Sequence, residues 1–280
     1  MPTVLSPDTP PELLGDLHPA WRGDIDALAP WRAAAEGFTS DRIADFPLAL
    51  VLADCGSTMD EAWQRIEEGG LNAWDSLLAA RQSGGRGRLR RPWTSPAGNL
   101  HVSLALPEPP QPFRNMTSLL VGWCLACALG RQGVCLKLKW PNDLLINDRK
   151  VGGALVEERK GRLVTGVGLN LVACPPDEAM RADRAVPAAK LHIPGKGPLR
   201  VWLDALPIFR EVWMKSQEGS PKDLARRVEG ALAWLGGRVG VRDGERVRTG
   251  RLLGLDERGG LLLAEDGGTS ALYSGSLFPL

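Results

Sequence analysis

Hydrophobic and polar positions follow two different periods along the chain, and these periods predict its elements. From residue 47 onward, short apolar runs are separated by longer stretches in which apolar residues recur every three or four positions. The short runs are typical of strands and the longer stretches of helices. Strands are predicted at 47–54, 75–81, 98–107, 135–140, 143–148, 150–158 and 162–171, and helices within 57–70, 115–133, 199–217 and 221–235.

Polar residues between these runs indicate the boundaries of the elements. Thr58 and Glu61 have the spacing of a capping box, which predicts that the first helix starts at Ser57 or Thr58. Turns are predicted at Asn147–Asp148 and Lys160–Gly161, so the strands on either side pair as neighbours. Strands and helices in this order predict the α+β class, with a mixed central β-sheet and helices.

The two ends of the chain have a different pattern. Residues 1–46 are rich in proline and predict an extended arm with one short helix, packed through Trp21 and Trp31. Residues 236–280 predict four or five short strands with Gly and Asp-Gly turns, which form a small β-barrel domain. The domains expected are therefore 1–46, 47–235 and 236–280.

Composition excludes several classes of function. The 280 residues include 34 basic and 33 acidic side chains, so there is no bulk charge to gather nucleic acid or an anionic membrane. The arm offers no recognition helix and no basic face, and no nucleic-acid partner is expected. No apolar run reaches the roughly 18 residues of a membrane span, and no signal segment is evident. A cytoplasmic location is expected.

The cysteines provide little sign of metal or redox chemistry. The five cysteines are an odd number, which argues for free thiols and against a disulfide framework. Cys124 and Cys127 form a CxxC, but they lie in an apolar helical run without a second CxxC. Core packing is the preferred interpretation, and no metal ligands are assigned.

One loop gathers charge of a single sign. Between the second and third predicted strands, Gly84, Gly85 and Gly87 alternate with Arg86, Arg88, Arg90 and Arg91. A solvated charge run is one interpretation of this loop. The other is an anion clamp, because glycine lets backbone N–H groups approach an anion closely and arginine binds carboxylate or phosphate through two parallel bonds.

A second stretch carries two lysines in one strand-turn-strand unit. Lys139 and Lys150 flank the sequence WPND at residues 140–143, so both ammonium groups are expected to reach one concave face. The alternative is an ordinary hairpin with solvated lysines.

These stretches together resemble the biotin protein ligase family. The loop GRGRLRRPWTSPAGNL is similar to the glycine-arginine loop of the family, and KWPNDLLINDRKVGG to its second signature. GSTMDEA resembles its Ser-Thr segment, and GVGLNL its glycine-rich strand. The resemblance runs from about residue 47 to the C-terminus. It implies a class II synthetase-like catalytic domain followed by a small SH3-like β-barrel.

The resemblance implies a two-step reaction of the biotin-[acetyl-CoA-carboxylase] ligase type (EC 6.3.4.15). Biotin attacks the α-phosphate of ATP to give biotinyl-5′-AMP, and a lysine of a biotin carboxyl carrier domain then takes the biotinyl group from it. The implied cofactors are ATP, biotin and Mg²⁺, and the implied partner is the carrier domain of a biotin-dependent carboxylase. A homodimer is left open.

The resemblance also implies roles for individual residues. The catalytic residues are Lys150, Arg88 and Arg86. Biotin-binding residues are Ser57, Thr58, Gln82, Gly85, Arg88, Lys150 and Gly153. ATP- or adenylate-binding residues are Arg86, Gly87, Trp93, Lys139, Asn142, Asp143 and Asn170.

Two departures from the family pattern bear on these assignments. Met59 stands where the family usually has Asn, which predicts the loss of an amide from the rim of the biotin pocket. Leu89 and Arg90 replace an expected Arg-Gly, which predicts a stiffer loop. Two alternatives stay open: a lipoate or octanoate ligase or transferase of the same fold, and a non-catalytic module that binds a small acid.

Overall fold

The computed structural model describes residues 3–5, 16–27, 47–176 and 186–280. The chain divides into two compact units, and each is assembled from separate segments. The first comprises Met1–Glu108, Leu155–Cys174 and Lys190–Pro207, and the second comprises Pro109–Ala154, Pro175–Ala189 and Ile208–Leu280. Among the helices within the described ranges, none has the length and apolar character needed to cross a bilayer.

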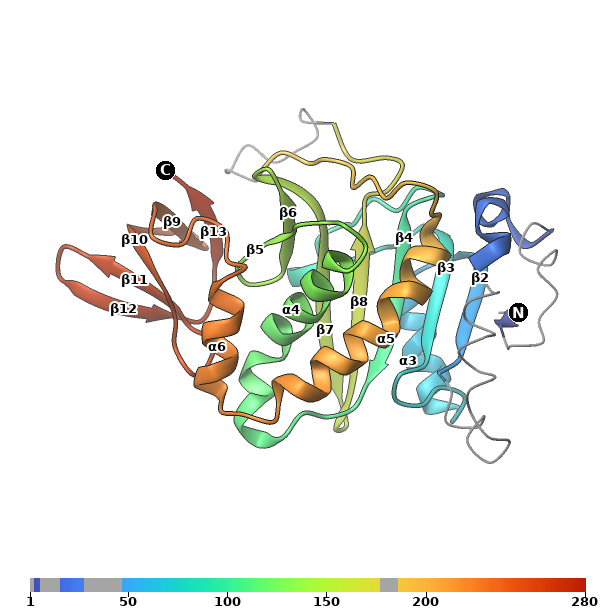
Figure 1. The fold of residues 1–280 in the computed structure, drawn as a ribbon, viewed down its shortest axis with the longest axis horizontal. Coiled ribbons are helices and arrows are strands. Elements are labelled where there is room, and N and C mark those ends of the chain that lie inside the picture. Colours follow the sequence, from blue (N-terminus) through green and yellow to red (C-terminus); the bar gives the residue numbers. More distant parts are fainter. Residues whose placement is uncertain (1–2, 6–15, 28–46, 177–185) are drawn as a thin grey trace. The chain divides into compact units, whose positions relative to one another are not determined.

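A mixed β-sheet forms the centre of the first unit (Figure 1). Strand β2 is parallel to β3, while β4 is antiparallel to both β3 and β8. The predicted mixed sheet is therefore confirmed. Its strands, in sheet order, are β1 (Thr3–Leu5), β2 (Ala49–Cys55), β3 (Ser76–Gln82), β4 (Leu100–Leu106), β8 (Arg162–Leu169) and the last residues of β7 (Arg149–Arg159).

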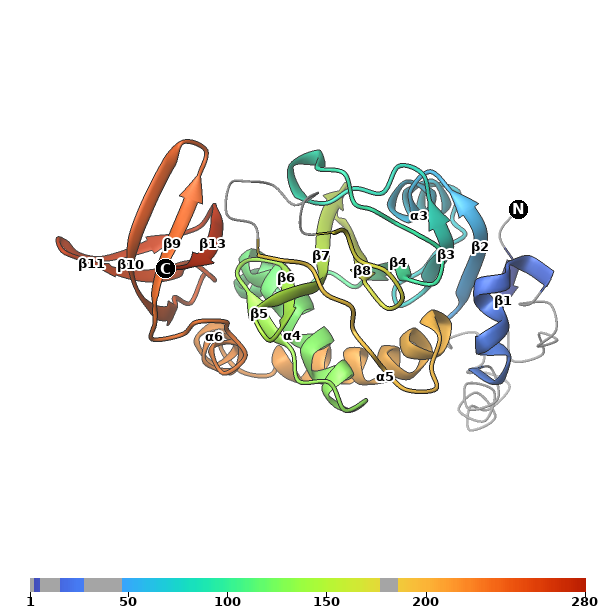
Figure 2. The same cartoon turned by 90° about the horizontal axis from the view of Figure 1, so that it is seen from above.

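Helices cover both faces of this sheet. Helix α3 (Thr58–Glu67) connects β2 to β3, and the first half of α5 (Pro198–Ser216) lies on the opposite face (Figure 2). A hydrogen bond of 3.0 Å from Trp202 Nε1 to Ser76 Oγ joins α5 to β3. Because both faces are covered, all seven residues of β4 are buried.

The described part of the N-terminal arm belongs to the first unit and packs within it. Residues Pro19–Ala27 form a 3₁₀ helix, and Trp21 within it is only 1% exposed. The predicted packing through tryptophan is confirmed for Trp21, whereas Trp31 lies outside the described residues. Asp24 is also buried and accepts hydrogen bonds from the backbone N–H groups of Leu199 and Arg200, at 3.0 and 3.2 Å. Asp24 thereby caps the start of α5.

The second unit contains the long apolar helix and the hairpin with the two lysines. Strand β6 is antiparallel to both β5 and the first part of β7, and Asn147 and Asp148 form the predicted turn with φ values of 47° and 58°. Cys124 is buried and Cys127 half-buried, which confirms core packing for the CxxC. The elements are η4 (Gln111–Met116), α4 (Thr117–Gly130), β5 (Lys137–Lys139), β6 (Asp143–Ile146) and α6 (Pro221–Glu229).

The C-terminal residues form a second, antiparallel sheet within this unit. Its strand order is β12-β11-β10-β9-β13, which confirms the predicted small β structure. Helix α6 ends at Glu229, before the predicted end at 235, and the chain beyond it pairs with β5 through an isolated bridge between Leu232 and Leu138. The strands are β9 (Arg238–Asp243), β10 (Arg246–Leu255), β11 (Leu261–Glu265), β12 (Gly268–Leu272) and β13 (Ser276–Pro279).

Candidate active site

The glycine-arginine loop connects β3 to β4 in the first unit and has a fixed base. Backbone hydrogen bonds of 2.8 Å run from Trp93 N–H to the Gly85 carbonyl and from Gly87 N–H to the Arg91 carbonyl. At Gly85 a Cβ atom would lie 2.6 Å from Ser95 Oγ and 2.8 Å from the Trp93 carbonyl. Only glycine fits there, which accounts for one of the glycines of the motif.

The tip of the loop is a short 3₁₀ turn, η3 (Arg88–Arg90). Arg88 is half-buried, and Leu89 is 79% exposed. Leu89 and Arg90 adopt left-handed backbone conformations, with φ values of 56° and 54°. Such conformations are disfavoured for non-glycine residues. Arg90 stands where the family pattern has glycine, and its backbone thus adopts a conformation that glycine favours.

A network of polar side chains surrounds Gln82 at the end of β3. Gln82 Oε1 accepts bonds from Thr58 N–H at 2.7 Å and Thr58 Oγ1 at 3.0 Å, and Gln82 Nε2 donates to Ser95 Oγ at 2.9 Å. Thr58 Oγ1 also accepts a bond from Ser103 Oγ at 2.9 Å. Three predicted biotin-pocket residues therefore meet here, since Ser57, next to Thr58, is buried as well.

This network shows why the predicted capping box is wrong. Ser57 is the N-cap of α3, and no side chain caps the helix there. The Thr58 hydroxyl is instead engaged with Gln82, which lies 24 residues further along the chain. A helix that gives up its cap in this way loses about 1 kcal/mol.

Arg86 is held by carboxylates in this structure. Its NH1 group donates to Asp60 Oδ2 at 2.6 Å and to Ser57 Oγ at 3.2 Å, and its Nε donates to Glu157 Oε1 at 3.2 Å. Burial lowers the pKa of the Arg86 guanidinium, but the bonds and charges of Asp60 and Glu157 outweigh this and raise it. The loop carries one sign of charge, but its first arginine already has acidic partners from α3 and β7.

Two glycines of the strand GVGLNL make room for side chains of the first unit. At Gly168 a Cβ atom would lie 2.6 Å from the indole ring of Trp93, and at Gly166 it would lie 2.9 Å from the sulfur of Met59. Met59 is 3% exposed and belongs to an apolar core cluster with Trp63. The side chain that replaces the expected Asn is therefore part of the core and not of a pocket rim.

In the second unit, two lysines converge on one carboxylate. Lys139 Nζ lies 2.7 Å from Asp143 Oδ2, and Lys150 Nζ lies 2.6 Å from Asp143 Oδ1. Burial raises the pKa of the Asp143 carboxyl, but the charges of Lys150 and Lys139 outweigh it and the pKa falls to about 2. This trio carries a net charge of +1 and favours an anion. The alternative of solvated lysines is wrong for Lys139, whose side chain is only 6% exposed.

Local backbone irregularity positions Lys150. The register of β6 and β7 shifts between Leu144 and Leu145, so that Leu145 pairs with Lys150 and Leu144 with Gly152. Such a bulge redirects side chains. The Lys150 backbone is fixed further by its N–H bond to the Pro187 carbonyl at 2.7 Å and by a bond to its own carbonyl from Ala189 N–H at 2.8 Å.

Asn142 and Gly153 adjoin the same trio. Asn142 Nδ2 donates to the Ala154 carbonyl at 2.8 Å, which fixes the amide. A Cβ atom at Gly153 would lie 3.4 Å from the Asn142 carbonyl and 3.5 Å from Asp143 Oδ1. Five of the predicted residues, Lys139, Asn142, Asp143, Lys150 and Gly153, thus form one cluster in the second unit.

A metal site built from protein side chains does not fit this arrangement. Both oxygens of Asp143 already contact ammonium groups, and magnesium prefers oxygen ligands free of competing cations. Across the ranges that the structure describes, no three His, Cys, Asp or Glu side chains gather as metal ligands do.

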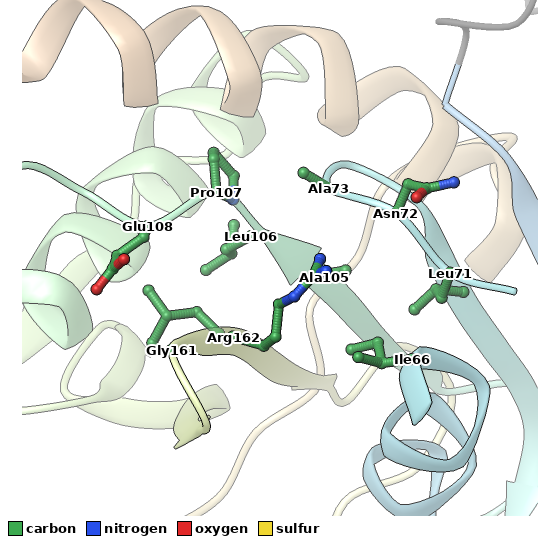
Figure 3. A pocket seen from close by; sticks show the side chains of 11 residues that line it. Ile66, Leu71, Asn72, Ala73, Ala105, Leu106, Pro107, Glu108, Gly161 and Arg162 are labelled. Carbon is green, nitrogen blue, oxygen red and sulfur yellow. The ribbon is translucent and has the colours of Figure 1, made fainter. Parts of the chain in front are cut away.

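A separate cavity of the first unit is not the candidate site. It has a volume of about 260 Å³ and lies where β4 ends and β8 begins, whereas the glycine-arginine loop precedes the start of β4 (Figure 3). None of the predicted site residues lines it. Its polar side chains are Asn72, Glu108 and Arg162.

The predicted residues therefore fall into two clusters, one in each unit. The first contains Ser57, Thr58, Gln82, Gly85 and Arg86, with Gly87, Arg88 and Trp93 on the same loop. Asn170 is buried directly after β8, and its carbonyl accepts a bond from Leu191 N–H at 2.6 Å. That Arg88 and Lys150 act on one phosphorus centre stays a prediction.

Sequence reasoning missed the acidic partners of the loop. Asp60 and Glu157 contact Arg86. The alternation of a strand places Glu157 and the neighbouring Glu158 on opposite faces, but it does not tell which of the two faces the loop.

Known proteins resemble the chain over most of its length. The model of the Biotin/lipoate A/B protein ligase family matches residues 53–172, and that of the Biotin protein ligase C terminal domain matches residues 235–278. The bifunctional ligase/repressor BirA of Escherichia coli (strain K12) is 31% identical over 239 residues, which cover 78% of this chain and 69% of that protein.

Two further relatives extend this comparison. The biotin--[acetyl-CoA-carboxylase] ligase of Paracoccus denitrificans is 28% identical, over 81% of this chain and 99% of that protein. Among solved structures, the biotin protein ligase from Aquifex aeolicus in complex with biotin and ATP superposes with a TM-score of 0.67. It is 32% identical, and the match covers 82% of this chain and 97% of that one.

Proposed function

The chain belongs to the biotin protein ligase family, and from this we infer that it is a biotin-[acetyl-CoA-carboxylase] ligase. It activates biotin with ATP and transfers the biotinyl group to a lysine of a carrier domain. The observation that carries this inference is the match, along 82% of the chain, to a ligase structure with biotin and ATP bound.

The first step joins two anions. An oxygen of the biotin carboxylate forms a bond to the α-phosphorus of ATP, the bond from that phosphorus to the bridging oxygen breaks, and pyrophosphate leaves. Cationic side chains and backbone N–H groups must offset the repulsion and the charge that develops at phosphorus. We propose that Lys150 and Arg88 supply this charge and that Arg86 adds to it from the base of the loop.

The remaining predicted residues have binding roles in this proposal. Ser57, Thr58 and Gln82 hold biotin, with Gly85 and Gly153 allowing the backbone to approach it. Trp93, Asn142 and Asn170 bind the adenylate, with Gly87, Lys139 and Asp143 nearby. Asp143 acts by orienting both lysines, because its carboxylate contacts both ammonium groups.

Magnesium, where the reaction uses it, would be held through the phosphate groups of the nucleotide, and it would help to neutralise their charge. This agrees with an Asp143 carboxylate that is already occupied by two lysines.

The second step consumes the activated acid. The amine of an acceptor lysine attacks the acyl carbon, AMP leaves, and the amine gives up a proton. The proposed partner is a biotin carboxyl carrier domain of a carboxylase, and the proposed location is the cytoplasm. We propose that the loop tip closes over the mixed anhydride and excludes water.

Pyrophosphate release with biotin, lipoate and octanoate as competing acids tests this function. We expect release with biotin and ATP, followed by labelling of a carrier domain. A preference for lipoate or octanoate would contradict the proposed substrate. Binding of biotin without any turnover would contradict the proposed enzyme.

A further inference from the structure

Glu157 on β7 lies where three side chains of the first unit meet. Besides Arg86, its carboxylate accepts a hydrogen bond from Trp63 Nε1 at 2.9 Å and one from Arg159 NH2 at 3.1 Å. The guanidinium of Arg159 also lies over the Trp63 ring, 4.7 Å from its centroid. Glu157 is therefore fixed from helix α3, from the loop and from its own strand.

The two carboxylates that contact Arg86 differ in how firmly they are held. The Asp60 side chain is 63% exposed, whereas those of Glu157 and Arg86 are 23% and 19% exposed. An exposed ion pair contributes little because water screens it. A partly buried carboxylate with several charged donors holds its partner in a defined geometry.

We propose that Glu157 is a positioning residue of the ligase reaction, which fixes the Arg86 guanidinium beside Ser57 and so anchors the base of the glycine-arginine loop. The proposal rests on the proposed function for the reaction that it serves. Glu157 does not touch reacting atoms and acts through Arg86. A cation that is held in place before the ligand binds needs no reorganisation during the reaction.

The substitution Glu157→Gln tests this role because it keeps the shape of the side chain and removes its charge. We expect kcat/KM for biotin in pyrophosphate release to fall by about ten- to a hundredfold, the range that the loss of a charged hydrogen bond produces. A thermal midpoint close to that of the unchanged protein is expected. Native kcat/KM in this variant would overturn the proposal.

A double-mutant cycle separates action through Arg86 from a general structural effect. If Glu157 acts through Arg86, the variant carrying both Glu157→Gln and Arg86→Gln has the activity of Arg86→Gln alone, within about twofold. Fully additive losses would contradict the proposed route.

Arg159→Gln is the matched control. It removes a different partner of the same carboxylate and leaves the contact of Glu157 with Arg86 in place. We expect its kcat/KM for biotin to stay within about twofold of the unchanged protein, as for an exposed ion pair. A loss equal to that of Glu157→Gln would assign the carboxylate a structural role only.

Amide hydrogen exchange of the substrate-free protein gives a readout that needs no turnover. We expect residues 85–93 to exchange faster in Glu157→Gln and unchanged in Arg159→Gln. Unaltered exchange in Glu157→Gln would overturn the anchoring of the loop. Absence of biotin-dependent pyrophosphate release in the unchanged protein would instead contradict the proposed function, so the two failures are distinguishable.

Discussion

Single residues in the candidate site are engaged by partners that the sequence pattern did not reveal. Resemblance assigned Lys139, Asp143 and Lys150 to the site, but the contact of both ammonium groups with one carboxylate depends on a strand bulge and appears only in the structure. Similarly, the sequence identified Met59 as a departure from the family, but only the packing against Gly166 places it in the core. Long-range contacts of this kind have no local signature.

Lys150→Ala is expected to lower biotin-dependent pyrophosphate release by about a hundredfold or more, because it removes a cation proposed to stabilise charge at phosphorus. The fold should persist, since Lys139 still pairs with Asp143. Rates and thermal midpoints of the variant check this. Lys137→Ala, an exposed lysine on β5, is the control with an expected native rate. Near-native turnover in Lys150→Ala would remove Lys150 from the proposed mechanism.

Gly168→Ala is expected to raise the KM for ATP about tenfold, while the KM for biotin changes little. The added methyl group would lie 2.6 Å from the Trp93 ring and must displace it, at a cost on the order of 1–3 kcal/mol. Steady-state kinetics with each substrate varied in turn measure both constants. Gly70→Ala, where the nearest atom is 3.7 Å away, is the matched control. Equal KM values for ATP in both variants would contradict the proposed role of Trp93 in binding the nucleotide.

At the scale of elements, local patterns were sufficient for strands and turns and insufficient for helix ends. The predicted strands and the turns at Asn147–Asp148 and Lys160–Gly161 are confirmed. The spacing of buried residues along a strand and the residue types of a turn are both local properties of the sequence, so they can be predicted from it. The capping box at Thr58 failed because the helix begins at Thr58, which makes Ser57 the cap position, and because Gln82, a distant residue, engages the Thr58 hydroxyl. Helix α6 ends early as well, and the chain just beyond it bonds to a distant residue, since the Ala231 carbonyl accepts a hydrogen bond from Leu138 N–H at 2.7 Å. At Thr58 a tertiary hydrogen bond therefore replaces the capping interaction that the local sequence predicts.

The loop tip provides a prediction at this scale. Arg88→Gly is expected to release activated biotin and to increase labelling of bystander lysines several-fold, because it removes a cation and adds backbone freedom to η3. Mass spectrometry of a mixture of unrelated proteins incubated with biotin and ATP measures such labelling. Arg91→Gly, which makes the same chemical change at the exposed base of the loop, is the control. Equal background labelling in both variants would show that Arg88 does not retain the intermediate.

At the scale of the whole molecule, each unit combines segments that are distant in the sequence. The first unit brings together residues from the N-terminus, from Leu155–Cys174 and from Lys190–Pro207. Asp24 and Leu199 are thus hydrogen-bonded across 175 positions. Resemblance to a family predicted which residues matter, and the interleaving of segments decides which of them meet. The predicted domain boundaries at 46 and 235 follow sequence order and stay predictions.

The buried carboxyl of Asp24 makes stability depend on pH. Burial raises the pKa of this carboxyl from 3.8 to about 6, although the bonds from the N–H groups of Leu199 and Arg200 oppose the rise. Between these values the folded state binds more protons than the unfolded state. The stabilisation that comes from the protonated Asp24 carboxyl is therefore complete below about pH 4, and it is lost as the pH rises through 6.

Asp24→Asn cannot titrate and removes this dependence. From pH 4 to pH 7, the stability of the unchanged protein relative to Asp24→Asn is expected to fall by up to about 3 kcal/mol, since one pKa unit corresponds to roughly 1.4 kcal/mol. Urea unfolding of both proteins across this range measures the difference. Other carboxyls with altered pKa, such as those of Asp75 and Asp143, are present in both proteins, so their contributions cancel in the difference. Parallel stability curves would show that Asp24 ionises in the folded protein as it does in the unfolded chain.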